Sequence, residues 1–288
     1  MKKTIFTCLA ILSCAFICAQ NVKVLNKNGE IVDIFSANEV SKVVFDKGPS
    51  FVKLDLPSGL KWATCNIGAN SPEEYGDYYA WGDTKLYYTY ENGQMKWIYP
   101  FNWGSYPLGN GNDSMNKYYS TDGLTTLLPE DDIASKSLGD NWRTPTFEEW
   151  VELQTNCVWV WTTDYSGKKG YIVYKAKKDE DKGKAYIQGT WKKFSYNDRS
   201  SGSQYVACED TPDNYTTTSD IHIFLPCASC ASEMKITGVG SSGYYWSSSI
   251  EPTRVPNAIC LAFDASKINS WKFSFYRYYG MSIRPVHP

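Results

Sequence analysis

Residues 139–153 read GDNWRTPTFEEWVEL, and this stretch contains the clearest helix signal in the chain. Thr146 is a residue type that caps helix N-termini, and Glu149 stands three positions later, as a capping box requires. Pro145 precedes the cap, and the residues after it place an apolar stripe on one helical face: Phe147, Trp150, Val151 and Leu153. The spacing predicts a helix that begins after Thr146 and packs this face into a core.

The rest of the segment 51–288 has no long apolar pattern of period 3.6. It consists of short aromatic and β-branched runs separated by Gly, Asn, Asp and Ser, which is typical of strands joined by irregular loops. A second short helix is expected near 129–137, because Glu130, Asp131 and Asp132 favour a helix start. The pattern predicts an α+β fold that is rich in β-strands, with few short helices and long irregular loops.

Size and charge exclude several classes of protein. The chain has 288 residues, 42% of them hydrophobic and 16% aromatic, which is enough to bury a core and argues against disorder. With 29 Lys and Arg against 31 Asp and Glu, the formal net charge is -2, so nucleic acid is not an expected partner. The only histidines are His222 and His287, which disfavours a His-rich metal site or a His-based catalytic triad.

Residues 1–20, MKKTIFTCLAILSCAFICAQ, have the pattern of a secretory signal peptide, with two lysines followed by an apolar run. We expect cleavage near Ala19 or Gln20, and a mature protein that is extracellular or on the outer cell surface. In the alternative, a lipoprotein, Ile11–Cys14 acts as a lipobox and Cys14 carries a lipid anchor. No later segment approaches the roughly 20 apolar residues of a membrane-spanning helix, so no transmembrane span is expected.

A small β element precedes the main domain. The segment 22–46 alternates apolar and polar residues around Asn28-Gly29, which predicts two strands joined by a tight turn and a third strand near 43–45. The residues Lys47-Gly48-Pro49-Ser50 then break the pattern. We therefore divide the chain into a signal peptide (1–20), a short N-terminal β element (21–48) and one main domain (49–288).

Four parts of the main domain carry a family likeness. They are 54–69 (LDLPSGLKWATCNIGA), 74–84 (EYGDYYAWGDT), 139–153, and a C-terminal block of 243–249 (GYYWSSS) with 276–286 (YRYYGMSIRPV). In this order they resemble the Fibrobacter succinogenes major paralogous domain of exported Bacteroidetes and Fibrobacter proteins. That family looks related to the C-type lectin-like fold, in the branch that also holds formylglycine-generating enzymes and variable receptor proteins. The resemblance implies a C-type lectin-like domain without a defined activity.

Most residues of these motifs suit a scaffold better than a catalytic site. Arg143 can donate several hydrogen bonds to neighbouring carbonyl groups. Arg284, in an alternating terminal strand, is expected to pair with an acid such as Asp77 or Glu149. Three glycines are expected at positions of tight backbone geometry: Gly76, Gly82 and Gly280.

Six cysteines follow the signal segment: Cys65, Cys157, Cys208, Cys227, Cys230 and Cys260. Cys227 and Cys230 have C-x-x-C spacing, and a local or structural disulfide is the preferred interpretation because no second pair completes a zinc site. The resemblance also suggests an enzymatic alternative, since formylglycine-generating enzymes use a reactive Cys pair that binds copper. The sequence around Cys227 departs from that active-site motif. The motifs of calcium lectins are also absent. From these observations together we expect no catalytic residue, no bound metal and no cofactor.

The region from Trp246 to Gly280 is the predicted ligand-binding surface. It mixes rigid aromatic side chains with Ser and Asn, which supply contact area and adaptable hydrogen bonds. Alternation within 271–276 places Trp271, Phe273 and Phe275 on a core face. It leaves Lys272, Ser274 and Tyr276 facing outward. The candidates for ligand contact are these three residues together with Arg254, Asn257 and Asn269. In the related variable receptors, the C-terminal region also displays the ligand-facing residues.

These observations predict a non-enzymatic binding module, exported or on the cell surface, that recognises a glycan or a protein. Two alternatives stay open. One is an oxidase similar to the formylglycine-generating enzymes, and the other is a structural cell-envelope protein without a discrete ligand. Bound copper with two reactive thiols would favour the oxidase, whereas an exposed aromatic and polar patch would favour binding.

Overall fold

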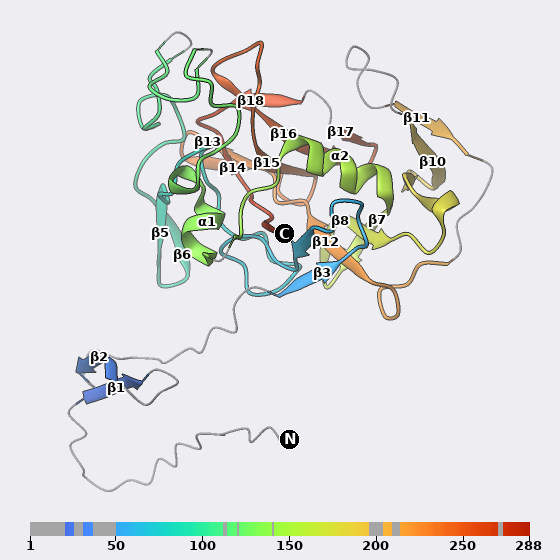
Figure 1. Cartoon of the computed structure of the whole chain (residues 1–288), viewed down its shortest axis with the longest axis horizontal. Helices are drawn as coiled ribbons and strands as arrows, with labels where there is room; N and C mark the ends of the chain where they lie inside the picture. The colour runs from blue at the N-terminus through green and yellow to red at the C-terminus, as the bar shows by residue number, and fades with distance from the viewer. Residues whose placement is uncertain are drawn as a thin grey trace, which may run out of the picture. The chain divides into compact units, whose positions relative to one another are not determined.

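The computed structural model describes residues 21–25, 31–36, 50–111, 114–119, 121–139, 141–195, 204–208, 214–269 and 273–288. The chain divides into two compact units, Met1–Lys47 and Gly48–Pro288, both drawn in Figure 1. In the first unit, β1 (Asn21–Leu25) and β2 (Ile31–Ser36) pair antiparallel, as the alternation of this segment predicts. The expected signal peptide, the Asn28-Gly29 turn and the third strand at 43–45 lie outside the described residues.

The second unit is mostly β and has few helices, as the sequence predicts (Figure 1). One sheet has the strand order β11-β10-β9-β7-β8-β12. Its neighbouring strands run antiparallel except β7 and β9, which run parallel. The strands are β7 (Cys157–Tyr165), β8 (Lys168–Lys175), β9 (Lys184–Ile187), β10 (Thr190–Ser195), β11 (Gln204–Ala207) and β12 (His222–Pro226).

A second sheet is built around β16, and smaller sheets complete the unit. β16 (Asn257–Asp264) pairs with β15 (Ser242–Ile250), β17 (Lys267–Asn269) and β18 (Ser274–Tyr276). The smaller sheets have the orders β14-β13-β19, β20-β4-β3 and β5-β6. Their strands are β3 (Phe51–Lys53), β4 (Lys61–Ala63), β5 (Tyr88–Glu91), β6 (Gln94–Trp97), β13 (Cys230–Ser232), β14 (Lys235–Thr237), β19 (Gly280–Met281) and β20 (Val286–His287).

Helix α2 (Phe147–Asn156) begins where the sequence places its cap. In α2, the Thr146 side chain accepts from the Glu149 N–H, and the Glu149 side chain accepts from the Thr146 N–H, so the predicted capping box is confirmed. The helix expected near 129–137 is divided by Asp132 into a 3-10 turn η1 (Pro129–Asp131) and α1 (Ile133–Leu138). A further 3-10 turn is η2 (Asp179–Asp181). None of the described helices has the length and apolar character that a membrane crossing requires.

The four motif segments meet in the core of the second unit. The Trp81 indole N–H donates to the carbonyl of Ser247 at 2.8 Å, and that of Trp246 donates to Tyr79 at 3.0 Å. The Trp150 ring packs against Trp62 with centroids 4.7 Å apart. Each of these contacts joins two motifs that lie far apart in the sequence. The buried tryptophans therefore act as scaffold, which is the role predicted for most residues of these motifs.

Arg284 contradicts the expected ion pair. Its fully buried guanidinium donates to the carbonyls of Ala63, Thr64 and Phe224 and to the side-chain oxygen of Asn66, at 2.7–3.1 Å. No acid among the described residues contacts it. Backbone carbonyls of β4 and β12 accept the hydrogen bonds that a carboxylate was expected to accept, because Arg284 lies between these two strands. The carboxylate of Glu149 instead pairs with Arg143, at 2.5 and 2.7 Å.

Candidate ligand-binding pocket

Four of the predicted site residues belong to β16 or to the strands that pair with it. Asn257 pairs with Tyr276 across β16 and β18, and Asn269 pairs with Ala262 across β17 and β16. Arg254 is exposed in the loop between β15 and β16. Lys272 and Trp271 lie outside the described residues. Asn257, Ser274 and Tyr276 therefore lie together near the start of β16, whereas Asn269 pairs near its other end.

Two of the candidates face each other rather than solvent. Asn257 is only 9% exposed, and its amide donates to the Ser274 hydroxyl at 3.2 Å. Its carbonyl accepts from the Arg277 guanidinium at 3.3 Å. Arg277 is fully buried and lies 4.8 Å over the Trp81 ring. The Asn257 amide thus bonds to β18, and little of this predicted ligand-contact residue is exposed.

Tyr276 is the exposed member of an aromatic surface. Its side chain is 40% exposed and stacks on Tyr278 with centroids 5.6 Å apart. Trp103, from a distant loop, meets both rings edge-on at 5.7 and 4.9 Å. Phe273 and Phe275, in contrast, pack against a core cluster, as the alternation predicts. The outward orientation of Tyr276 is therefore confirmed.

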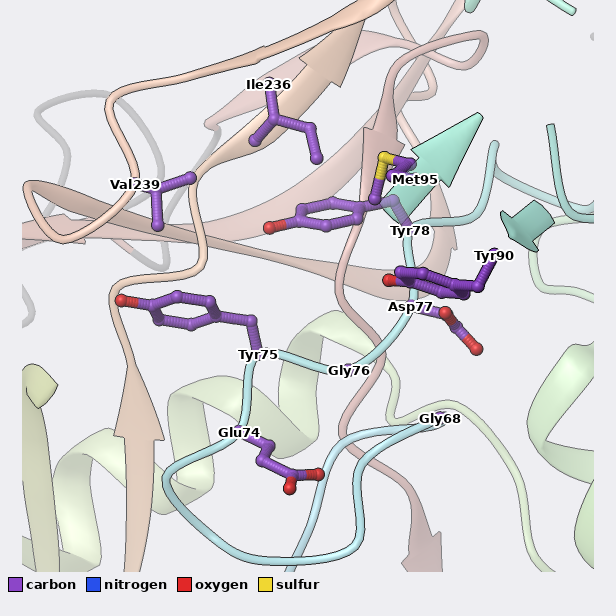
Figure 2. Close-up of a pocket in the computed structure, with 10 residues that line it drawn as sticks. All are labelled: Gly68, Glu74, Tyr75, Gly76, Asp77, Tyr78, Tyr90, Met95, Ile236 and Val239. Atoms are coloured by element: carbon purple, nitrogen blue, oxygen red, sulfur yellow. The ribbon is translucent and has the colours of Figure 1, made fainter. Parts of the chain in front are cut away.

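A pocket of about 550 Å³ lies elsewhere on the second unit (Figure 2). This volume falls within the range of small-ligand pockets, roughly 300–1,000 Å³. We call it the tyrosine pocket, because three of the side chains that line it are tyrosines. The lining residues are Gly68, Glu74, Tyr75, Gly76, Asp77, Tyr78, Tyr90, Met95, Ile236 and Val239.

The floor of the tyrosine pocket depends on two glycines. Gly76 has φ +71°, and a Cβ there would come within 2.3 Å of the Ile67 carbonyl oxygen. Gly68 has φ +80°, and a Cβ there would come within 2.2 Å of Oδ2 of Asp77. Both positions therefore require glycine, for the left-handed backbone and for the close approach. The tight geometry predicted for Gly76 is confirmed.

Three tyrosine rings form the walls. Figure 2 shows the rings of Tyr75, Tyr78 and Tyr90 around the space next to Gly76, with Val239 and Ile236 on another side. The Tyr78 hydroxyl is fixed by donation to the Ala228 carbonyl at 2.6 Å. Tyr90 comes from β5 and is 55% exposed, so its ring is accessible from solvent. The pocket thus combines a fixed inner ring with an accessible outer one.

Hydrogen bonds hold the acidic part of the pocket. The Tyr88 hydroxyl donates to Oδ1 of Asp77 at 3.0 Å and accepts from the Tyr78 N–H at 2.9 Å. The Asp77 N–H donates to the Ile67 carbonyl at 2.8 Å. Burial raises the pKa of Asp77 above its usual range, and the hydrogen bond from Tyr88 partly opposes this effect. The chain therefore places a partly desolvated carboxylate beside aromatic rings.

The C-x-x-C pair is not a disulfide, contrary to the preferred interpretation. Cys227 belongs to the core cluster that contains Trp62 and Trp150, whereas Cys230 packs against a different cluster. The two thiols thus serve as apolar groups of separate clusters. Burial raises the pKa of Cys227 to about 12 and that of Cys230 to about 11, so both are protonated at neutral pH. Within the described residues, no group of three or more His, Cys, Asp or Glu could hold a metal ion.

The tyrosine pocket was not predicted from the sequence. Its residues 74–78 belong to the motif EYGDYYAWGDT, which was interpreted as scaffold. A signal was nevertheless present, because two carboxylates and several tyrosines stand within six residues around a glycine. The opposite wall, with Tyr90, Ile236 and Val239, comes from distant hairpins and has no local signal.

Comparison of the chain with protein-family models, with curated proteins and with solved structures finds no match in any of the three. The choice of a function therefore depends on the geometry and chemistry of the two surfaces described above. One is a concave pocket with tyrosines and carboxylates, and the other is the aromatic surface around Tyr276.

Proposed function

We propose that this chain is an exported or cell-surface, non-enzymatic binding module that recognises a glycan in the tyrosine pocket. The observation that carries the proposal is the cavity of about 550 Å³ whose walls combine three tyrosine rings with two carboxylates. The flat apolar face of a sugar ring can stack on an aromatic ring. Sugar hydroxyls donate to carboxylate oxygens, which accept several hydrogen bonds each. A C-type lectin-like domain is the fold proposed from the four motifs.

A glycan array tests this proposal on the mature chain. Tyr90→Ala removes the accessible wall, and we expect affinity for the bound glycan to fall about tenfold, because ring contacts of this kind contribute on the order of 1 kcal/mol. Tyr119→Ala is the matched control, since Tyr119 is 39% exposed and does not line the pocket. Equal losses in both variants, or no glycan bound by the parent chain, would overturn the proposal.

Protein recognition by the aromatic surface around Tyr276 is the second candidate function. It is favoured by a specific observation, the stacking of a 40% exposed Tyr276 on Tyr278 beside Trp103. Exposed aromatic side chains with restricted rotamers are common at the centres of protein interfaces. A partner bound here would be lost in Tyr276→Ala and retained in Tyr90→Ala, so the two variants separate the two surfaces.

The oxidase alternative receives less support from the same geometry. Such chemistry needs a reactive thiolate, whereas burial raises the pKa of both Cys227 and Cys230.

Export is tested separately by measuring the intact mass of protein purified from its native host. An intact mass equal to that of a chain that begins near Asn21 supports signal cleavage. A mass that fits a chain beginning at a lipid-modified Cys14 would instead show the anchored form.

A further inference from the structure

We propose that the tyrosine pocket selects a glycan with a protonated amino group, such as glucosamine, and holds the ammonium between the Asp77 carboxylate and the Tyr90 ring. The inference rests on the proposed function and assigns the chemical class of its ligand. A carboxylate beside an accessible aromatic ring is the arrangement that recognises alkylammonium groups, by a charge-assisted hydrogen bond and by cation–π attraction.

The lining of the pocket carries charge of one sign. Glu74 and Asp77 are acidic, and none of the described lining residues is Lys, Arg or His. In Figure 2 the Asp77 carboxylate lies on the Tyr90 side of the pocket, while the Glu74 side chain leaves the backbone away from the Tyr75 ring. An acidic sugar would be repelled at Asp77. A protonated amine would gain a hydrogen bond roughly twice as strong as a neutral one.

Asp77 is fixed on one oxygen and keeps the other for a ligand. Oδ1 accepts from the Tyr88 hydroxyl at 3.0 Å, and the backbone of Asp77 is held by the carbonyl of Ile67. Oδ2 packs against Gly68, where a Cβ would come within 2.2 Å of it. Among the described residues, no donor is hydrogen-bonded to Oδ2. This oxygen therefore retains the acceptor capacity that an ammonium group needs.

One tyrosine of the pocket already attracts a cation. The Lys168 ammonium lies 4.7 Å from the centroid of the Tyr75 ring. The tyrosine rings here thus lie in surroundings where a positive charge is favourable over the ring face. Among the described residues, no protein cation lies over the Tyr90 ring. The pKa of Tyr90 is raised above its usual value, first by burial and second by the negative charge of Asp77. The electrostatic field at Tyr90 therefore also favours a cationic ligand.

The same groups give binding a defined pH dependence. Burial raises the pKa of Asp77, so its carboxylate becomes protonated at a higher pH than an exposed one and then loses the ammonium. At high pH the sugar amine itself loses its proton. Binding is expected to pass through a maximum between these two limits. The titratable groups around Asp77 are Glu74, Tyr75, Tyr78, Tyr79, Tyr88 and Tyr90, with Lys168 over Tyr75.

Three matched oligosaccharides test the inference on the full mature chain by calorimetry. The hexamers of β-1,4-linked glucosamine, N-acetylglucosamine and glucose differ only at C2, which carries an ammonium, an acetamide or a hydroxyl group. We expect the glucosamine hexamer to bind about tenfold more tightly than the other two at neutral pH, and less tightly in high salt. Equal binding of all three would overturn the amine selectivity and leave the glycan function intact. Binding of none of the three, when the array shows another glycan bound, would also overturn the amine selectivity. Binding of no glycan at all on the array would overturn the proposed function itself.

Two variants separate charge from shape. Asp77→Asn keeps the size of the side chain and an acceptor for Tyr88, so we expect it to abolish the preference for glucosamine and flatten the pH profile. Glu148→Gln removes the same charge from an exposed helix position outside the pocket and should leave the preference unchanged. Lys168→Met removes the competing cation and should tighten glucosamine binding several-fold. Weaker glucosamine binding in Lys168→Met, or an unchanged preference in Asp77→Asn, would contradict the inference.

Discussion

Arg284 shows how a single residue can join strands without a counter-charge. Its guanidinium donates to three backbone carbonyls and to Asn66, and burial lowers its pKa without removing the charge. Arg284→Met preserves much of the side-chain volume but leaves buried acceptors without donors. We expect a loss of about 3 kcal/mol in the free energy of unfolding, measured by urea denaturation.

The exposed Arg254 provides the control for this prediction. It lies in the loop between β15 and β16, and replacing it with alanine is expected to change stability by less than about 0.5 kcal/mol. A similar loss in both variants would mean that net charge, and not the hydrogen bonds of Arg284, determines the effect.

Gly68 and Gly59 form a pair that separates backbone strain from crowding. Both have positive φ, +80° and +76°, so alanine at either position meets the same backbone penalty, on the order of 1 kcal/mol. A Cβ at Gly59 meets nothing within 4 Å, whereas one at Gly68 overlaps the Asp77 carboxylate. We expect Gly68→Ala to be more destabilising than Gly59→Ala and to weaken ligand binding as well. Equal unfolding midpoints for the two variants would contradict the crowding argument.

At the level of elements, α2 depends on its N-terminus. Thr146 and Glu149 satisfy each other's backbone N–H groups, and the Glu149 carboxylate also pairs with Arg143. Thr146→Ala is expected to cost about 1 kcal/mol of unfolding free energy, the usual effect of losing an N-cap. Thr155→Ala is a suitable control near the other end of α2, where the hydroxyl bonds only to groups of the same helix, the Val151 and Glu152 carbonyls and the Asn156 amide. A smaller loss for Thr146→Ala than for Thr155→Ala would contradict the prediction.

The sequence predicts elements with local determinants and misses contacts that depend on topology. The α2 cap, the helical segment near 129–137 and the outward Tyr276 follow from residues within a few positions of each other. The partners of Arg284 cannot be predicted in this way, since Ala63 is 221 positions away in the sequence. These partners are mostly backbone carbonyls, which no sequence motif identifies. The tyrosine pocket also depends on contacts between distant segments. One wall comes from the single motif 74–84, and the other comes from β5, β6, β14 and the loop after β14.

For the whole molecule, strand pairing closes the second unit on itself. β3 and β4, near its start, form one sheet with β20 at its end, and Val286 pairs with Trp62. Arg143, beside the α2 cap, also exchanges backbone hydrogen bonds with Val286. Segments from the start, middle and end of the unit therefore depend on one another, and unfolding of this unit should be cooperative.

This closure predicts that the second unit is stable by itself. The described core clusters and every residue of the tyrosine pocket lie within Gly48–Pro288. A chain that begins at Gly48 should therefore unfold in one transition, with a free energy of unfolding within about 0.5 kcal/mol of that of a chain that begins at Asn21. Its affinity for the glucosamine hexamer should also be unchanged. Urea denaturation and calorimetry of the two chains make the comparison. A loss of stability in the shorter chain would show that residues 21–47 support the domain, and a loss of affinity alone would show that they contribute to the site.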